Sequence, residues 1–314
     1  MTVELLERGY EVIVLDNLEK GHKAAVMAPA KLCVGDLRDP DCLDKIFKEH
    51  KIDAVMHFAA YSLVGESMAQ PDKYYHNNVY GSLCLLNAMK KHNVNKIVFS
   101  SSAATYGEPE KVPITEDQKT QPSSPYGQTK LAVEKMLLWF DKAYGIKYMA
   151  LRYFNVAGAH ISGKIGEDHR PETHLIPLVL GTALGKTECI RIFGGDYDTP
   201  DGTCIRDYIH VTDLSLAHVL ALDKLFADDA ESKTYNLGYG RGFSNMEIVE
   251  TARRVTGVPI KLEMAKRRPG DPSILIASPA AIIIDLGFSP RYDCLEKIIE
   301  TAWAFHKNYP DGFM

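Results

Sequence analysis

The regular alternation of short apolar runs with longer helical patterns in the first half of the chain most constrains its fold. Runs rich in β-branched and aromatic residues are typical of buried strands, and they occupy residues 31–36, 53–60, 95–102 and 146–155. Helical patterns separate them, for example at 39–50 and 73–92. Strands alternating with helices form βαβ units with right-handed crossovers, so the sequence predicts an α/β fold with a doubly wound, Rossmann-type parallel sheet.

Composition excludes several functional classes. The 314 residues carry a formal net charge of −5, which gives no general attraction to nucleic acid or anionic lipid. No run of 18 apolar residues and no basic segment followed by an apolar stretch occurs, so we expect neither a membrane partner nor a secretory signal. The six cysteines lack C-x-x-C spacing, which favours free thiols in a reducing compartment. We therefore expect a soluble, cytoplasmic protein without nucleic-acid or membrane partners.

Polar residues follow most of the predicted strands. In a parallel α/β sheet, ligands bind at the carboxyl ends of the strands, where these residues should gather. The positions at these strand ends are Asp16 and Asn17, Asp36 and Leu37, Ala59 and Ala60, Ser100 to Ser102, and Asn155, most of them polar.

The sharpest chemical signal is the pair Tyr126 and Lys130 in SPYGQTK. The spacing of four places both side chains on one face of a helix. A lysine ammonium beside a phenol lowers the phenol's pKa, and such a tyrosine can take a proton from a hydroxyl group. The alternative is a surface helix pair, since about one chance Y-x-x-x-K is expected among sixteen tyrosines. The hydroxyl cluster ending in Ser102 favours the catalytic reading.

Four segments together, SSSAATYG, SPYGQTK, LRYFNVAGAH and DGTCIRDYIHVTDL, resemble the extended short-chain dehydrogenase/reductase superfamily and, more narrowly, the UDP-glucose (UDP-galactose) 4-epimerases. The resemblance extends from residue 2 to the C-terminus. It implies an NAD-dependent isomerase that oxidises UDP-glucose or UDP-galactose at C4, lets the 4-keto sugar rotate, and reduces it on the opposite face.

The resemblance also implies a role for individual residues. Tyr126 would be the base, with Lys130 tuning it and Ser102 bound to the reacting hydroxyl. NAD would contact these two catalytic residues, Tyr126 and Lys130, together with Asp16, Asn17, Asp36, Leu37, Phe58, Ala59, Asn77, Ser100 and Tyr153. The UDP-sugar would contact Ser102, Asn155, Leu175, Phe193, Arg206, Arg268 and Asp271. We expect residues 1–155 to form the NAD-binding domain and 156–314 a smaller mixed α/β substrate-binding region, interleaved with the first. Family analogy implies a homodimer.

Departures from the family pattern limit the reactions that we expect. Dehydratases of the superfamily carry an Asp-Glu pair after the hydroxyl residue, whereas Ala103 and Ala104 follow Ser102, which argues against elimination. Leu275 occupies the position that gates sugar size and is intermediate in bulk. A residue of this size leaves open the alternative that the chain is a UDP-N-acetylhexosamine 4-epimerase. A further alternative is another sugar-nucleotide epimerase or a decarboxylase of the same fold, which substrate profiling would distinguish.

The opening MTVELLERGYEVIVLDN predicts the end of a helix, a stop at Gly9 and a strand ending in Asp16. The acid that binds the adenosine ribose should follow a first strand and a glycine-rich loop by about 20 residues. Only fifteen residues precede Asp16, so we expect that strand and loop to be missing. A chain of this form would bind NAD weakly or fold poorly, and the alternative is an inactive nucleotide-sugar binder.

Two further motifs are interpreted as structural. Gly238, Gly240 and Gly242 have the wrong spacing for a phosphate loop and predict a turn before a helix capped by Ser244 or Asn245. His160, His169 and His174 show neither H-x-x-x-H spacing nor an acidic partner pattern, so no metal site is expected.

Overall fold

The computed structural model describes residues 1–268 and 271–313. Pro269 and Gly270 of the KRRPGD motif, and Met314, lie outside the described residues. The helices are α1 (Thr2–Glu7), α2 (Pro40–Glu49), α3 (Val64–Ala69), α4 (Pro71–Tyr74), α5 (Gly81–Lys91), α6 (Pro125–Tyr144), α7 (Leu175–Ala183), α8 (Val211–Phe226), α9 (Asn245–Thr256), α10 (Ala280–Leu286) and α11 (Leu295–Asn308). Three short segments are η1 (Lys23–Ala25), the π-helical η2 (Tyr75–Tyr80) and η3 (Ala103–Thr105). Among these helices, none is both long and apolar enough to cross a bilayer.

The strands are short, and many pair in parallel. They are β1 (Ile13–Asp16), β2 (Lys31–Val34), β3 (Val55–His57), β4 (Lys96–Ser102), β5 (Lys147–Tyr153), β6 (Asn155–Ala157), β7 (Ile190–Phe193), β8 (Ile205–Arg206), β9 (Tyr208–His210), β10 (Lys233–Leu237), β11 (Phe243–Ser244), β12 (Leu262–Ala265) and β13 (Ile274–Leu275). The four strands predicted from residues 31–36, 53–60, 95–102 and 146–155 are therefore confirmed as β2, β3, β4 and β5.

The central sheet has the order β10-β5-β4-β3, and all its strands run parallel. Successive residues of β4 face opposite layers: Phe99 packs with α5 and α6, and Val98 packs with α8. Burial on both faces explains the consecutive apolar residues at 97–99 of β4. The predicted α/β class is confirmed. The register pairs Ser102 with Tyr153, so these two residues end β4 and β5 side by side.

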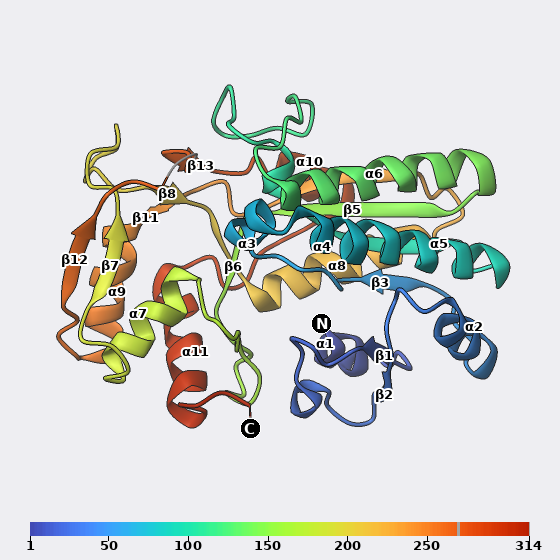
Figure 1. Cartoon of the computed structure of the whole chain (residues 1–314), viewed down its shortest axis with the longest axis horizontal. Helices are drawn as coiled ribbons and strands as arrows, with labels where there is room; N and C mark the ends of the chain where they lie inside the picture. The colour runs from blue at the N-terminus through green and yellow to red at the C-terminus, as the bar shows by residue number, and fades with distance from the viewer. Residues whose placement is uncertain (269–270, 314) are drawn as a thin grey trace.

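The N-terminal segment forms the structure that its sequence predicts. Helix α1 ends before Gly9, whose φ of +81° suits glycine, and β1 then runs to Asp16. β1 pairs with β2 in a separate two-stranded parallel sheet. Within residues 1–268 and 271–313 no backbone ladder joins this pair to β3, and Figure 1 shows β1 and β2 in blue apart from the central sheet.

The two predicted helices differ in regularity. Residues 39–50 form α2, whose N-cap Asp39 accepts hydrogen bonds from the amides of Asp41 (3.0 Å) and Cys42 (3.2 Å). Residues 73–92 are helical but not uniform, because η2 inserts a π-helical segment between α4 and α5. Such segments interrupt the regular α-helical bonding and often mark functional positions. Here the segment carries Asn77 and Asn78.

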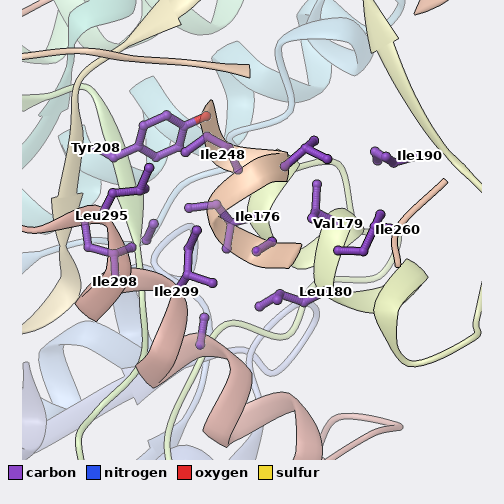
Figure 2. Packing of buried hydrophobic residues seen from close by; sticks show 14 of the residues in the cluster. Ile176, Val179, Leu180, Ile190, Tyr208, Ile248, Ile260, Leu295, Ile298 and Ile299 are labelled. Carbon is purple, nitrogen blue, oxygen red and sulfur yellow. The ribbon is translucent and has the colours of Figure 1, made fainter. Parts of the chain in front are cut away.

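The second half of the chain contributes to both parts of the molecule. α8 packs on the central sheet and β10 pairs with β5. The chain therefore returns after residue 156 to the layer built on the central sheet, called here the first layer. A separate core lies between α7, α9 and α11, where Ile176 and Val179 of α7, Ile248 of α9 and Ile298 of α11 converge (Figure 2). The boundary between regions 1–155 and 156–314 stays a prediction.

Candidate active site

A cavity of about 700 Å³ opens at the carboxyl ends of β4 and β5. Its wall combines residues from both halves of the chain, as expected for a ligand site at the edge of a parallel sheet. The predicted site residues that line it are Ser102, Tyr126, Tyr153, Asn155, Leu175 and Arg206, and Leu275 joins them. The other predicted site residues do not belong to its lining.

The start of α6 places Tyr126 in this cavity. Ser124 is the N-cap, and its hydroxyl accepts a hydrogen bond from the Gly127 amide (3.2 Å). A side chain at Gly127 would put its Cβ 2.3 Å from the carbonyl oxygen of Ala104, so glycine is what lets α6 lie against the loop after β4. That loop begins at Ser102, whose hydroxyl accepts from the Ala104 amide (3.1 Å). The glycine thereby brings the serine and tyrosine hydroxyls to one wall.

Lys130 lies one turn further along α6 and is buried. Its Nζ donates to the carbonyl of Ser100 (2.7 Å) and lies 5.9 Å from the centre of the Tyr126 ring. Burial lowers the pKa of Lys130 to about 7, and the carboxylate of Glu134 opposes that shift. Burial raises the pKa of Tyr126, with the Ser102 hydroxyl acting the other way. In this structure the Lys130 ammonium donates to a backbone carbonyl, so the expected lowering of the Tyr126 pKa by Lys130 stays a prediction.

A buried polar network behind Lys130 is the main feature that sequence reasoning missed. Glu134 accepts a bidentate pair from Arg152 (2.9 and 2.6 Å) and a hydrogen bond from the Ser101 hydroxyl (2.5 Å). Arg152 also donates to the Tyr106 hydroxyl (2.9 Å). A signal was present in the sequence, since Glu134 continues the spacing of four from Tyr126 through Lys130.

The remaining residues predicted around the nicotinamide end lie just after β3, within β4 and η2, and at the end of β5. The hydroxyl of Ser100 is hydrogen-bonded to that of Tyr153. Phe58 is exposed, and its ring centre lies 4.8 Å from that of the buried His218. Asn77 donates to Asn78 (3.0 Å), and Ala59 is exposed.

The predicted adenosine residues form a second group at the ends of β1 and β2. Asn17 donates to the carboxylate of Asp36 (3.1 Å), and Asp16 accepts from the Leu18 amide (2.7 Å). Arg38 makes a bidentate pair with Asp36 (2.8 and 2.6 Å) and holds the pKa of that carboxyl well below its usual range. Leu37 packs against the core formed by α2, α5, α6 and the sheet. Arg38 was not predicted, although its place two residues after Asp36 suits such a pair.

The predicted diphosphate and uridine residues form a third group. Arg206 is paired with the carboxylate of Asp271 and donates to the carbonyl of Pro272 (2.7 Å). The guanidinium of Arg268 lies 4.0 Å from the centre of the Phe193 ring. The structure thus joins these four residues in two pairs, of which only Arg206 lines the cavity.

The glycines at 238–242 form a turn, as predicted, and backbone amides of this turn bind a buried carboxylate. The amides of Tyr239 (2.9 Å) and Gly240 (3.0 Å) donate to Asp207, and a side chain at Gly238 would collide with that carboxylate. Ser244 caps α9 in a reciprocal capping box with Glu247, which confirms the predicted cap.

The expectation that the loop histidines lack acidic partners is wrong. Glu167 lies 3.2 Å from Nδ1 of His169 and 2.5 Å from Nδ1 of His174, and Glu172 lies near both rings. The helical spacing rule missed this arrangement because residues 167–174 form an irregular loop, in which residues two and seven apart can meet.

The fold and cavity define an enzyme with a dinucleotide-type sheet and a serine, a tyrosine and a lysine at its edge. The chain belongs to the NAD dependent epimerase/dehydratase family, whose model matches residues 1–238. It is 56% identical over 309 residues to the UDP-glucose 4-epimerase of Halalkalibacterium halodurans, covering 98% of this chain and 92% of the relative.

Solved structures point to the same group within the family. A crystal structure of a UDP-glucose 4-epimerase has a TM-score of 0.98 at 54% identity, covering 100% of this chain and 95% of that one. The UDP-glucose 4-epimerase from Bifidobacterium longum, in complex with NAD+ and UDP, has a TM-score of 0.94 at 40% identity, covering 99% and 95%. Within the family, the chain groups with the UDP-glucose 4-epimerases.

The residues at the strand ends fit the adenosine and nicotinamide parts of NAD. The carboxylates of Asp16 and Asp36 are acceptors suited to ribose hydroxyls and adenine amino groups. At the other end, His218 is buried with no hydrogen-bond partner for Nε2 among the described residues, beside the exposed ring of Phe58. Such an orphaned polar atom next to an exposed aromatic ring suits a polar, planar group such as nicotinamide.

Proposed function

We propose that this chain interconverts UDP-glucose and UDP-galactose by oxidation at C4, rotation of the 4-keto sugar and reduction of its opposite face. The observation that carries the proposal is the single cavity that Ser102 and Tyr126 share, with Lys130 buried behind them. The similarity to UDP-glucose 4-epimerases over nearly the whole chain supports it.

Tyr126 takes the proton of the sugar 4-hydroxyl and returns it when the ketone is reduced. NAD, when bound, supplies the hydride acceptor and donor. Ser102 binds the same hydroxyl and orients its proton towards the phenol oxygen. Lys130, which donates to the Ser100 carbonyl in this structure, would hold the nicotinamide ribose when NAD is bound, and its ammonium would then favour the phenolate form of Tyr126.

The remaining predicted residues hold the two nucleotides. Asp16, Asn17, Asp36 and Leu37 contact adenosine, and Phe58, Ala59, Asn77, Ser100 and Tyr153 contact the rest of NAD. Arg206 and Arg268 grip the diphosphate of the UDP-sugar, because a guanidinium matches phosphate oxygens with two parallel hydrogen bonds. Asp271 accepts the uridine ribose hydroxyls, while Asn155, Leu175 and Phe193 border the nucleotide.

The UDP anchor explains why one active site can work on both faces of the sugar. The nucleotide stays bound through charged groups from β8 and the segment around Asp271, while the hexose makes few fixed contacts and can rotate. Leu275 lines the cavity and pairs with Arg206 across β13 and β8. It borders the space in which the hexose turns, and its size decides whether an N-acetyl group fits.

Conversion of UDP-galactose to UDP-glucose by the purified protein, with NAD supplied, tests the proposal. We expect turnover with both sugars, followed through a UDP-glucose-specific coupled reaction. UDP-N-acetylgalactosamine is the second substrate to compare, and faster turnover of that sugar would shift the assignment to a UDP-N-acetylhexosamine epimerase. No conversion of either pair, with NAD demonstrably bound, would overturn the proposal.

We also infer that two copies of this chain form a dimer through α6 and the η2–α5 segment. Large aromatic side chains on these neighbouring helices face solvent, among them Tyr75, Tyr80, Trp139 and Tyr144. Apolar side chains gathered on two adjacent helices are typical of an interface with a second copy. Light scattering should give twice the chain mass, and Trp139→Glu should halve it, whereas a monomeric wild-type protein would refute the inference.

We also place this protein in the cytoplasm. Its six cysteines are free thiols, as a reducing compartment favours.

A further inference from the structure

Four side chains of the loop before α7 converge on one point at the border of the cavity. This His–Glu cluster consists of Glu167, His169, Glu172 and His174, whose ligand atoms all lie within 4.8 Å of one another. One oxygen of Glu167 lies 3.2 Å from Nδ1 of His169 and 2.5 Å from Nδ1 of His174. Glu172 lies 3.7 Å and 3.6 Å from the same two nitrogens.

Three of these separations are close to those around a small tetrahedral cation, and the fourth, 2.5 Å between Glu167 and His174, is a hydrogen-bond distance that a bound ion would widen. Zn²⁺ binds imidazole nitrogen and carboxylate oxygen at about 2.0–2.1 Å, which places tetrahedral ligands about 3.4 Å apart. The four measured nitrogen-oxygen separations lie on both sides of that value. Two carboxylates and two neutral imidazoles also balance the charge of one divalent ion.

The loop is held in place independently of any ion. Both backbone amides that follow Glu172 donate to its carboxylate, from Thr173 (2.7 Å) and His174 (2.8 Å). A side chain at Gly166 would put its Cβ 2.3 Å from the ring of Phe305, so this part of the loop lies against α11. Hydrogen bonds of this kind hold a metal-ligating side chain in its orientation.

We propose that the His–Glu cluster binds one divalent transition-metal ion of the Zn²⁺ type as a structural site. Four protein ligands complete a tetrahedral shell and leave no position for catalysis. Glu167, His169 and His174 line the cavity next to Leu175, so the ion fixes the cavity wall at the N-terminal end of α7. The metal takes no part in hydride or proton transfer.

Zinc content after reconstitution tests this site directly. The protein is stripped with a chelator, exposed to Zn²⁺, desalted, and assayed by mass spectrometry for metal per chain. We expect about one tightly held ion per wild-type chain and at least a roughly tenfold lower content in His169→Ala/His174→Ala. Both proteins keep all six cysteines, so zinc held by thiols contributes equally to both.

His160→Ala is the matched control, since His160 lines the same cavity outside the cluster, and we expect it to retain zinc. Replacement by Co²⁺ supplies a second readout, because tetrahedral Co²⁺ absorbs visible light far more strongly than octahedral Co²⁺. We expect that absorption in wild type and its loss in Glu172→Gln. A wild-type chain that retains no zinc, or a double variant that retains as much as wild type, would overturn the proposal.

Discussion

At the scale of single residues, the charge on Glu134 maintains the protonation of Lys130. Glu134 is the group that opposes the effect of burial on the Lys130 pKa. Glu134→Gln removes that charge, so the Lys130 pKa falls further and the alkaline limb of the activity profile shifts to lower pH. The variant also leaves Arg152 buried without its carboxylate, a loss that typically costs about 3–5 kcal/mol of stability.

Ser101→Ala is the control for this prediction. It removes one hydrogen bond to Glu134 but keeps the carboxylate charge. We expect its pH profile to match that of the wild-type enzyme. Equal profiles for Glu134→Gln and wild type would show that Glu134 acts only as a structural partner of Arg152.

A second residue-scale prediction concerns stability at acidic pH. Burial lowers the pKa of His57 to about 3, and the nearby Lys130 acts in the same direction. Below about pH 6.5 the unfolded state binds a proton that the folded state does not, so stability falls as pH decreases from about 6.5 towards 3. One such proton is worth up to about 1.4 kcal/mol per pH unit within that window.

Urea unfolding at a series of pH values between 7 and 5 measures this effect. His218 and His210, whose pKa values burial lowers to about 4, contribute in the same direction. His57→Gln should retain its partner Ser82 and reduce the slope of stability against pH by about one proton. An unchanged slope in His57→Gln would contradict the assignment of a neutral His57.

At the scale of elements, the cap of α9 stabilises the second core. The Ser244 hydroxyl accepts from the Glu247 amide (3.0 Å), and Glu247 in return accepts from the Ser244 amide (2.7 Å). Ser244→Ala leaves both the helix amide and Asp201 without this hydroxyl and should cost about 1–2 kcal/mol. Thermal unfolding should show a clearly smaller loss for Ser244→Thr, which keeps the oxygen, and equal losses would exclude capping as the cause.

The elements differ in how far sequence could predict them. β4 and β5 are buried on both faces and each contains a run of consecutive apolar residues, at 97–99 and 148–151, from which they could be predicted. β8 and β13 are two residues long, and they pair across nearly seventy residues of sequence, so no local pattern marks them. The π-helical form of η2 could not be predicted either, because its apolar spacing resembles that of an ordinary helix.

The residues of the candidate site likewise differ in whether the sequence alone could identify them. Tyr126 and Lys130 are local in sequence, and motif spacing could identify them. The Glu134–Arg152 pair depends on how α6 lies over β5, and the His–Glu cluster depends on an irregular loop. Helical spacing rules say nothing about either kind of contact, which only the tertiary structure brings together.

At the scale of the whole molecule, the cavity joins two layers that fold around separate cores. The first layer packs the central sheet between α8 on one face and α5 and α6 on the other, and the second packs α7, α9 and α11 against one another. Tyr126 comes from the first layer and Leu175 and Arg206 come from the second, so the proposed reaction needs both layers. The central claim is that Tyr126 on the first layer transfers the proton while the second layer holds the nucleotide.

Turnover of UDP-galactose by Tyr126→Phe, measured beside UDP binding, tests that claim most directly. Removing a general base typically costs about 10²–10⁴-fold in rate, so we predict a loss in that range. UDP affinity should stay close to the wild-type value, because Arg206 and the other proposed nucleotide contacts are unchanged. A variant that retains more than about a hundredth of the wild-type rate would contradict the assignment of Tyr126 as the base.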